Sequence, residues 1–154
     1  MAVTIIFLPL LSFLFCFFLG NKFHFRVYQF ISTVALFICA IFSWIIFLQY
    51  FSDKETQIIY ILNWITSGTF IVDWSIRLDT LTTVMFMVVT TVSACVHLYS
   101  IGYMDQDQSK VRFMGYLSLF TFFMLALVSS NNLLQMFFGW EGVGLASYLL
   151  IGFW

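Results

Sequence analysis

Residues 133–153 read LLQMFFGWEGVGLASYLLIGF, an apolar run whose only charged residue is Glu141. A helix needs about 20 apolar residues to cross the ~30 Å hydrocarbon layer of a bilayer. The run is long enough for one crossing, so it predicts a transmembrane helix that carries a carboxyl group inside the membrane.

Four similar apolar runs come earlier in the chain, separated by polar segments: residues 2–19, 27–50, 81–101 and 111–129. The whole sequence is 62% hydrophobic and only 8% charged, whereas about a quarter of the residues in a soluble domain are charged. We therefore expect an all-α integral membrane protein in which residues 1–154 form a single membrane domain of about five transmembrane helices.

Composition also excludes several functions. The formal net charge is −1 and the basic residues are dispersed, so we expect no basic surface that could bind nucleic acid. The expected surrounding of the chain is the lipid bilayer. Cys16, Cys39 and Cys95 lie in separate apolar runs and form no Cys-x-x-Cys pair. We expect them to pack between helices, and we expect neither a metal nor a cofactor in this chain.

The basic residues predict an orientation in the membrane. The two short turns and their flanks hold Lys22, Arg26, Lys110 and Arg112, whereas the longer connection holds Lys54 and Arg77. Cytoplasmic and matrix loops carry an excess of Lys and Arg, so the short turns should face inside and the N-terminus outside. The first apolar run has no signal-peptide features and should be retained.

The longer connection, residues 51–80, changes its hydrophobic period. From Phe70 to Leu78, apolar and polar positions alternate as in a half-buried strand. We expect residues 58–78 to form a two-stranded β-hairpin on the outside, between the second and third helices, with Phe70 and Trp74 facing the protein. Asp79 directly precedes the third helix and should cap it.

Glu141 is the residue most indicative of function. At 1.5 Å rise per residue it lies roughly 12 Å from Leu133, near the membrane midplane. An acidic side chain there costs several kcal/mol unless it is neutral or paired, so it is a candidate proton-transfer group. Gly142 and Ala146 form a small-xxx-small pair, supplemented by small residues at 139, 144 and 147, which should let other helices approach the Glu141 turn.

The segment from Gly139 to Phe153 closely resembles the signature segment of the NADH dehydrogenase subunit 5 family, the distal antiporter-like membrane subunits of respiratory complex I. Four further segments look like the same family in the same order: residues 68–73, 78–82, 97–104 and 132–134. The resemblance covers about residues 60 to 154. It implies that the chain is the N-terminal part of such a subunit.

The resemblance also implies partners. In that family the glutamate matching Glu141 belongs to a charged chain along the midplane and pairs with a lysine on a broken helix further downstream. The sequence has no such lysine, so we expect a split subunit in which a second chain completes the fold and supplies it. Other membrane subunits of complex I are further expected partners, and electron transfer from NADH to ubiquinone is expected to occur elsewhere, without a redox centre in this chain.

His97 is the second candidate. We expect it about one turn from the inside end of the third helix, where its ring could reach interfacial water and join a proton relay, or could simply be hydrogen-bonded. Two other functions stay open: a subunit of a multisubunit cation/proton antiporter, and a structural scaffold with a neutral Glu141. The 21 phenylalanines are typical of an AT-rich organelle genome, so we expect the mitochondrial inner membrane, with the bacterial plasma membrane as the alternative.

Overall fold

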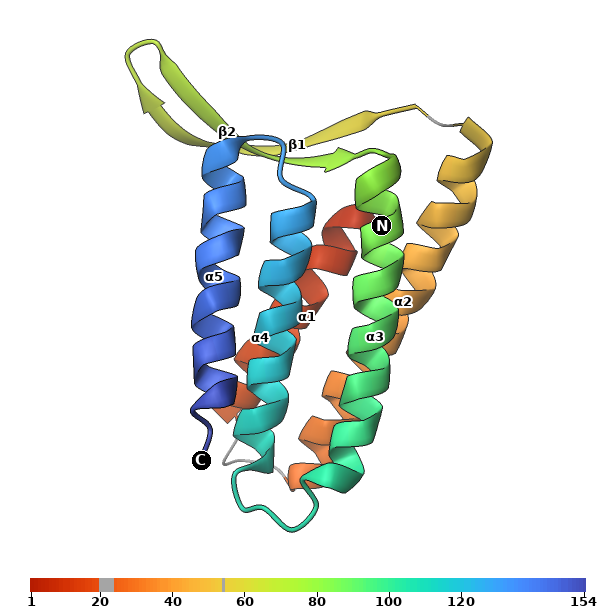
Figure 1. Ribbon diagram of the computed structural model, residues 1–154, viewed down its shortest axis with the longest axis vertical. Coiled ribbons are helices and arrows are strands. Elements are labelled where there is room, and N and C mark those ends of the chain that lie inside the picture. The colour runs from red at the N-terminus through yellow and green to blue at the C-terminus, as the bar shows by residue number, and fades with distance from the viewer. Residues whose placement is uncertain (20–23, 54) are drawn as a thin grey trace.

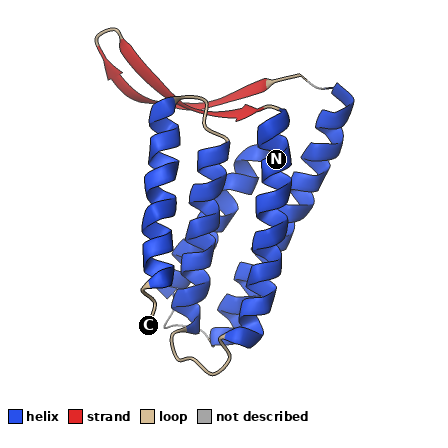
Figure 2. Ribbon diagram, viewed as in Figure 1, coloured by secondary structure: helices blue, strands red, loops and turns tan. Residues whose placement is uncertain are grey.

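The computed structural model describes residues 1–19, 24–53 and 55–154, and it contains five helices long and apolar enough to cross a membrane. The helices are α1 (Ala2–Leu19), α2 (Phe25–Asp53), α3 (Thr80–Tyr103), α4 (Lys110–Val128) and α5 (Leu133–Ile151). Their ends differ from the expected ones by at most three residues. The all-α membrane fold with a small hairpin is therefore as predicted (Figure 2).

The helices run up and down in two layers. α3, α4 and α5 form the front layer, and α1 and α2 lie behind it (Figure 1). α4 lies in the middle and packs against α1, α3 and α5, whereas α5 is at the edge. The main core forms where α1, α2, α3 and α4 meet, around Ile5, Phe86 and Leu125.

Two of the three cysteines are placed as expected for residues that pack between helices, and the expectation for the third is wrong. Cys16 and Cys39 are buried, and Cys16 lies beside Gly115 of α4. Cys95 is exposed on α3.

The predicted hairpin is present between α2 and α3. β1 (Gln57–Ser67) pairs antiparallel with β2 (Phe70–Leu78), and the turn contains Gly68 with φ +58°, a conformation that glycine adopts without strain. The hairpin lies across one end of the bundle (Figure 1). Two hydrogen bonds tie it to the connection between α4 and α5: Arg77 N donates to the Ser129 carbonyl at 2.9 Å, and Asn132 Nδ2 donates to the Asp73 carbonyl at 2.8 Å.

One detail of the predicted hairpin is wrong. Trp74 does face the protein and packs against Phe138 with ring centroids 5.0 Å apart. Phe70, however, is 57% exposed. The tip of the hairpin extends past α5, so residues near the turn have no helix beneath them (Figure 1).

The basic residues separate as the charge pattern predicted. Arg26, Lys110 and Arg112 lie at the end of the bundle opposite the hairpin, whereas Arg77 lies on β2. Lys110 Nζ sits over the Phe25 ring at 3.6 Å from its centroid, which brings the starts of α2 and α4 together. Lys22 and Lys54 fall outside the described residues. Which end faces the matrix or cytoplasm stays a prediction.

Asp79 caps α3, and its removal has a pH-dependent consequence. Its carboxylate accepts a hydrogen bond from Thr82 N at 2.8 Å, and this bond lowers the Asp79 pKa below its ordinary value. A lowered folded-state pKa means that the stabilisation is complete above the unfolded pKa of about 4 and is lost as pH falls through the folded value. Asp79→Ala should lower the free energy of unfolding in detergent by about 1 kcal/mol at pH 7, and by less at pH 3.

Asp79→Asn is the matched control for this cap, because asparagine caps helices about as well but does not titrate. It should keep most of the stability at pH 7. A loss from Asp79→Ala that is equally large at pH 7 and pH 3 would contradict the role of the ionised carboxylate.

Candidate functional site

α5 is held in place by a cap and by close packing against α4. The Asn132 side chain accepts a hydrogen bond from Gln135 N at 2.8 Å and caps the helix. A Cβ atom added to Gly139 would lie 2.7 Å from Leu127 Cα, and one added to Gly142 would overlap the Phe123 ring. The small residues therefore serve the contact between α5 and α4.

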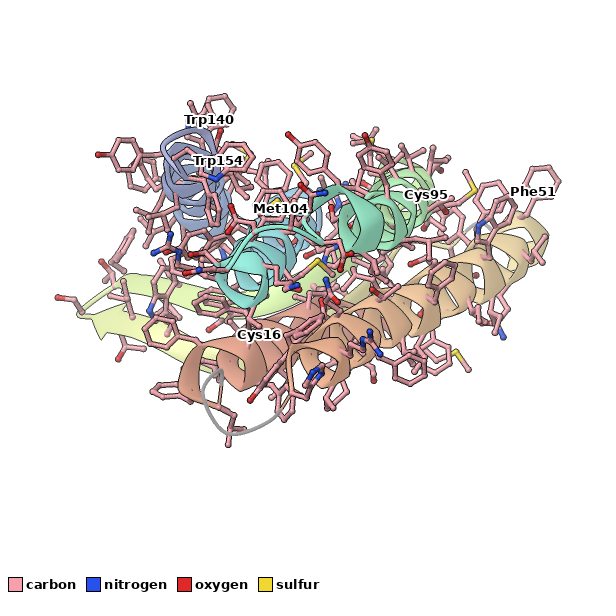
Figure 3. The ribbon with its side chains drawn as sticks, turned by 90° about the horizontal axis from the view of Figure 1, so that it is seen from below. Cys16, Phe51, Cys95, Met104, Trp140 and Trp154 are labelled. Atoms are coloured by element: carbon pink, nitrogen blue, oxygen red, sulfur yellow. The ribbon has the colours of Figure 1, made fainter. Side chains whose placement is uncertain are left out.

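Glu141 lies on a different face of α5 from these small residues. Its side chain is exposed, as is that of Trp140, which is 68% exposed and points away from the bundle (Figure 3). The same exposed face continues through Leu145 and Tyr148. We expected the small residues Gly142 and Ala146 to let other helices approach the Glu141 turn. α4 does approach this turn, but on the side of Gly142, and no described helix covers the side of Glu141.

Glu141 is near the middle of its helix. At 1.5 Å rise per residue it lies roughly 12 Å from Leu133 and roughly 15 Å from Ile151. In the described part of the chain, no side chain hydrogen-bonds or ion-pairs with its carboxyl group. The described basic residues are at the helix ends or on the hairpin, about half a membrane away along the helix axes. A carboxylate at this depth with no cation beside it is unfavourable in hydrocarbon.

His97 is fully buried, which corrects the expectation that its ring would reach interfacial water. It lies six residues before the last residue of α3, and its exposed fraction is 0%. Its Nδ1 is 2.8 Å from the Ser93 carbonyl oxygen, and its Nε2 is 3.1 Å from Ser118 Oγ on α4. The structure does not bring His97 and Glu141 together: α3 and α5 lie on opposite sides of α4 (Figure 1).

The sequence reasoning missed the partners of His97. Serines occur in each of α1, α2, α3 and α4, and such residues in membrane helices indicate close packing in general. The contact with Ser93 lies within α3, but nothing in the spacing of the serines shows that Ser118 of α4 is the second partner. Only the fold places Ser118 opposite His97.

Comparison with known proteins gives consistent results along the chain. Residues 64–114 match the family described as NADH-ubiquinone oxidoreductase (complex I), chain 5 N-terminus. Residues 130–154 match the family described as NADH:quinone oxidoreductase/Mrp antiporter, transmembrane. The second segment contains Glu141.

Full-length relatives match most or all of the chain. NADH-quinone oxidoreductase subunit L of Rickettsia conorii is 57% identical over 129 residues, which are 84% of this chain and 20% of the relative. The subunit L of Rickettsia felis is 50% identical over 154 residues, 100% of this chain and 24% of the relative. NADH-ubiquinone oxidoreductase chain 5 of Chondrus crispus is 48% identical over 154 residues, 100% of this chain and 23% of the relative.

A bundle of five helices long and apolar enough to cross a membrane, with an acidic residue halfway along one of them, defines a polytopic membrane protein. The sequence matches identify which family of membrane proteins this is. The chain belongs to the chain 5 and subunit L family of NADH:quinone oxidoreductases, and it corresponds to the N-terminal part of that family's proteins. It spans about a fifth to a quarter of the length of these relatives.

Proposed function

We propose that this chain is part of the membrane arm of a proton-translocating NADH:quinone oxidoreductase and that Glu141 transfers protons there. The observation that carries the proposal is the position of Glu141: it lies midway along a spanning helix, on a face that the other four helices leave uncovered. Intramembrane carboxyl groups generally face a bundle interior or a hydrated cavity and mark ion or proton paths.

The exposed face of α5 is the place where the rest of the subunit is expected. A carboxylate that faced lipid permanently would be unfavourable, so other protein is expected to cover it. The chain spans only about a quarter of the length of its relatives, so the rest of such a protein could provide this cover. We infer that further helices of the subunit cover Glu141 and bring a lysine to it. Other membrane subunits of the oxidoreductase are the remaining partners.

A lysine beside Glu141 would make proton binding switchable. With the lysine close, the ionised carboxylate is favoured; with the lysine withdrawn, the carboxylate takes up a proton. One charge crossing a potential of 100 mV gains or loses ~2.3 kcal/mol, so a small movement of such a pair can couple to proton transport. The oxidation of NADH and the reduction of the quinone belong to other subunits of the assembly.

The chain is a multi-pass membrane protein, and its relatives include both chain 5 and subunit L proteins. The phenylalanine-rich composition favours the mitochondrial inner membrane, and a bacterial plasma membrane is the alternative. A multisubunit cation/proton antiporter is the second candidate, because the family matching residues 130–154 is named for both kinds of protein.

Purification of the tagged chain from its native membrane tests the proposal. The preparation should contain the NADH-oxidising subunits together with the remaining helices of this subunit, and it should reduce quinone with NADH. In sealed vesicles, addition of NADH should acidify the lumen on the side to which protons are pumped. Co-purification with antiporter subunits alone, together with sodium-driven pH changes and no NADH oxidation, would support the antiporter instead.

A further inference from the structure

Polar side chains gather where α1, α2, α3 and α4 meet, at a site separate from Glu141. We call them the Ser118 cluster, and they are Ser12 of α1, Ser32 of α2, Ser93 and His97 of α3, and Ser118 and Thr121 of α4. All are buried except Ser93, which is half-buried. Uncompensated polar groups are unfavourable in a membrane interior, so a cluster drawn from four helices needs an explanation.

Ser118 connects the members of the cluster. Its Oγ lies 3.3 Å from Ser12 Oγ and 3.3 Å from Ser32 Oγ. It also lies 3.1 Å from His97 Nε2 and 3.1 Å from the Met114 carbonyl oxygen. A hydroxyl group donates one hydrogen bond and accepts up to two. Ser118 must therefore choose among these partners, and the choice depends on His97.

The contacts of His97 fix its neutral tautomer. A carbonyl oxygen only accepts hydrogen bonds, so Nδ1, at 2.8 Å from the Ser93 carbonyl, carries the hydrogen. In the neutral ring Nε2 is then an acceptor, and Ser118 donates to it. The two lone pairs of Ser118 remain for the hydroxyl groups of Ser12 and Ser32, so each hydroxyl hydrogen has a partner.

A proton on His97 reverses this arrangement. Both ring nitrogens then carry hydrogen, so Nε2 donates to Ser118, and Ser118 turns its own hydrogen toward the Met114 carbonyl or toward a neighbouring serine. The cluster thus has two hydrogen-bonding states that differ by one proton. Among the described Asp, Glu, Lys and Arg residues of α1 to α4, Arg26 and Arg112 are nearest along the chain, each six residues, or roughly 9 Å of helix, from Ser32 and Ser118 respectively.

Two further side chains of α2 point to water beside the cluster. Gln29 Nε2 and Thr33 Oγ1 are buried and have no hydrogen-bond partner among the described residues. Gln29 lies three residues before Ser32 on the same side of the helix, closer to the end of the bundle that carries the basic residues. Buried polar groups without a protein partner are typically satisfied by water, which would extend the hydrogen-bonded chain toward that end.

The other side of the cluster leads toward α5. Ser93 Oγ is 2.5 Å from Thr121 Oγ1. Both residues line a groove of about 420 Å³ between α3, α4 and α5, to which α5 contributes Ser147. Ser147 lies six residues after Glu141 on that helix. The polar chain therefore ends at a groove beside the helix that carries the proposed proton-transfer residue.

We propose that the Ser118 cluster is a proton relay that carries protons from the end of the bundle opposite the hairpin, through water at Gln29, to the groove beside α5. The inference rests on the proposed function, because it supplies protons to the same subunit. The relay is distinct from the path through Glu141 and its lysine, and it uses no charged partner.

Each proton-transfer step in this relay has a donor and an acceptor among the residues of the cluster or water. Ser118 passes its proton to His97 Nε2 and takes one from Ser32 or Ser12, which is replenished from water. The resulting imidazolium gives up its Nδ1 proton to Ser93 Oγ, 3.5 Å away, and Ser93 passes a proton to Thr121. One proton enters and one leaves. The ring is left with hydrogen on Nε2 and returns to its first tautomer by turning over.

Ser118→Ala in the assembled oxidoreductase tests the relay, because it removes the connecting hydroxyl and changes the side-chain volume little. A positioned proton-transfer group is typically worth about 10²–10⁴-fold in rate. The proton uptake carried by this subunit should therefore slow at least about tenfold, and fewer protons should move per NADH oxidised in sealed vesicles. Assembly and the rate of quinone reduction in uncoupled vesicles should match those of the parent.

Ser43→Ala is the matched control. Ser43 is also a fully buried serine in a helix, and among the described residues its hydroxyl group hydrogen-bonds only the Cys39 carbonyl of its own helix, at 2.8 Å. The ratio of protons to NADH should be unchanged in this variant. A purely structural role for Ser118 would lower the amount of assembled protein and leave that ratio intact. Parent-like pumping by Ser118→Ala overturns the relay.

Further variants cover the case in which Ser118→Ala does not assemble. Ser12→Ala combined with Ser32→Ala then removes both donors to Ser118 and keeps Ser118 and His97; a lowered ratio of protons to NADH supports the relay, and an unchanged ratio overturns it. Glu141→Gln, measured in parallel, separates the two proposals. Loss of pumping in Glu141→Gln with normal pumping in Ser118→Ala rejects the relay alone, whereas normal pumping in Glu141→Gln rejects the role of Glu141 whatever Ser118→Ala does.

Discussion

Replacing Glu141 with glutamine is expected to abolish proton transport through this subunit while leaving the protein assembled in the membrane. Glutamine has nearly the same size and keeps a hydrogen-bonding carbonyl, but it cannot bind and release a proton. The change also removes the free-energy cost of holding a charge at the midplane, so it should not weaken assembly. Proton transfer that depends on this group should slow by about 10²–10⁴-fold.

The measurement is the number of protons moved per NADH oxidised, in vesicles containing the assembled complex. Glu55→Gln is the matched control, because Glu55 is the only other glutamate in the sequence and lies exposed in the connection between α2 and β1. That variant should pump normally. If Glu141→Gln also assembles and pumps normally, Glu141 is a neutral packing group and the chain acts as a scaffold.

The second large effect is expected from a single added methyl group at Gly139. The Cβ atom of Gly139→Ala would lie 2.7 Å from both the backbone nitrogen and the Cα atom of Leu127, and backbone atoms cannot turn aside as a side chain can. Forcing α5 away from α4 should cost about 1–3 kcal/mol, as overpacking typically does. We expect the free energy of unfolding of the isolated chain in detergent to fall accordingly.

Gly144→Ala provides the control on the same helix. A Cβ atom at Gly144 meets nothing within 4 Å, and alanine favours helix by up to about 1 kcal/mol over glycine. The isolated chain should therefore be as stable as the parent or slightly more stable. Equal losses in the two variants would show that helix propensity or the micelle, rather than contact with Leu127, determines the result.

These residues also show how far the sequence alone could predict the site. Run length and polar punctuation were sufficient for the five helices, and the alternation between Phe70 and Leu78 was sufficient for a strand. The place of Glu141 near the middle of its helix followed from the length of the apolar run. The exposure of Phe70 did not follow, because alternation indicates which face of a strand is buried but not how far a hairpin extends past the helices beneath it.

The direction of Glu141 was also beyond sequence reasoning. Small residues indicate that a helix is approached closely, but both sides of α5 carry them, at Gly139 and at Gly144. Only the placement of α4 shows that Gly139 is the contact and that Gly144 lies on the exposed face with Glu141. The Ser118 cluster is similar in this respect, since its members come from four helices and no local pattern joins them.

The attachment of the hairpin implies an order for biogenesis. Its bond from Asn132 to Asp73 joins residues 59 positions apart, so β2 leaves the ribosome well before its partner is synthesised. Until α3 and α4 have both been inserted, the edge of β2 at Ile76 and Arg77 lacks the α4–α5 connection with which it finally pairs. The hairpin can therefore reach its final place only after α4 has been inserted into the bilayer. Formation of the contacts between β2 and the α4–α5 connection would thus indicate that α4 is inserted.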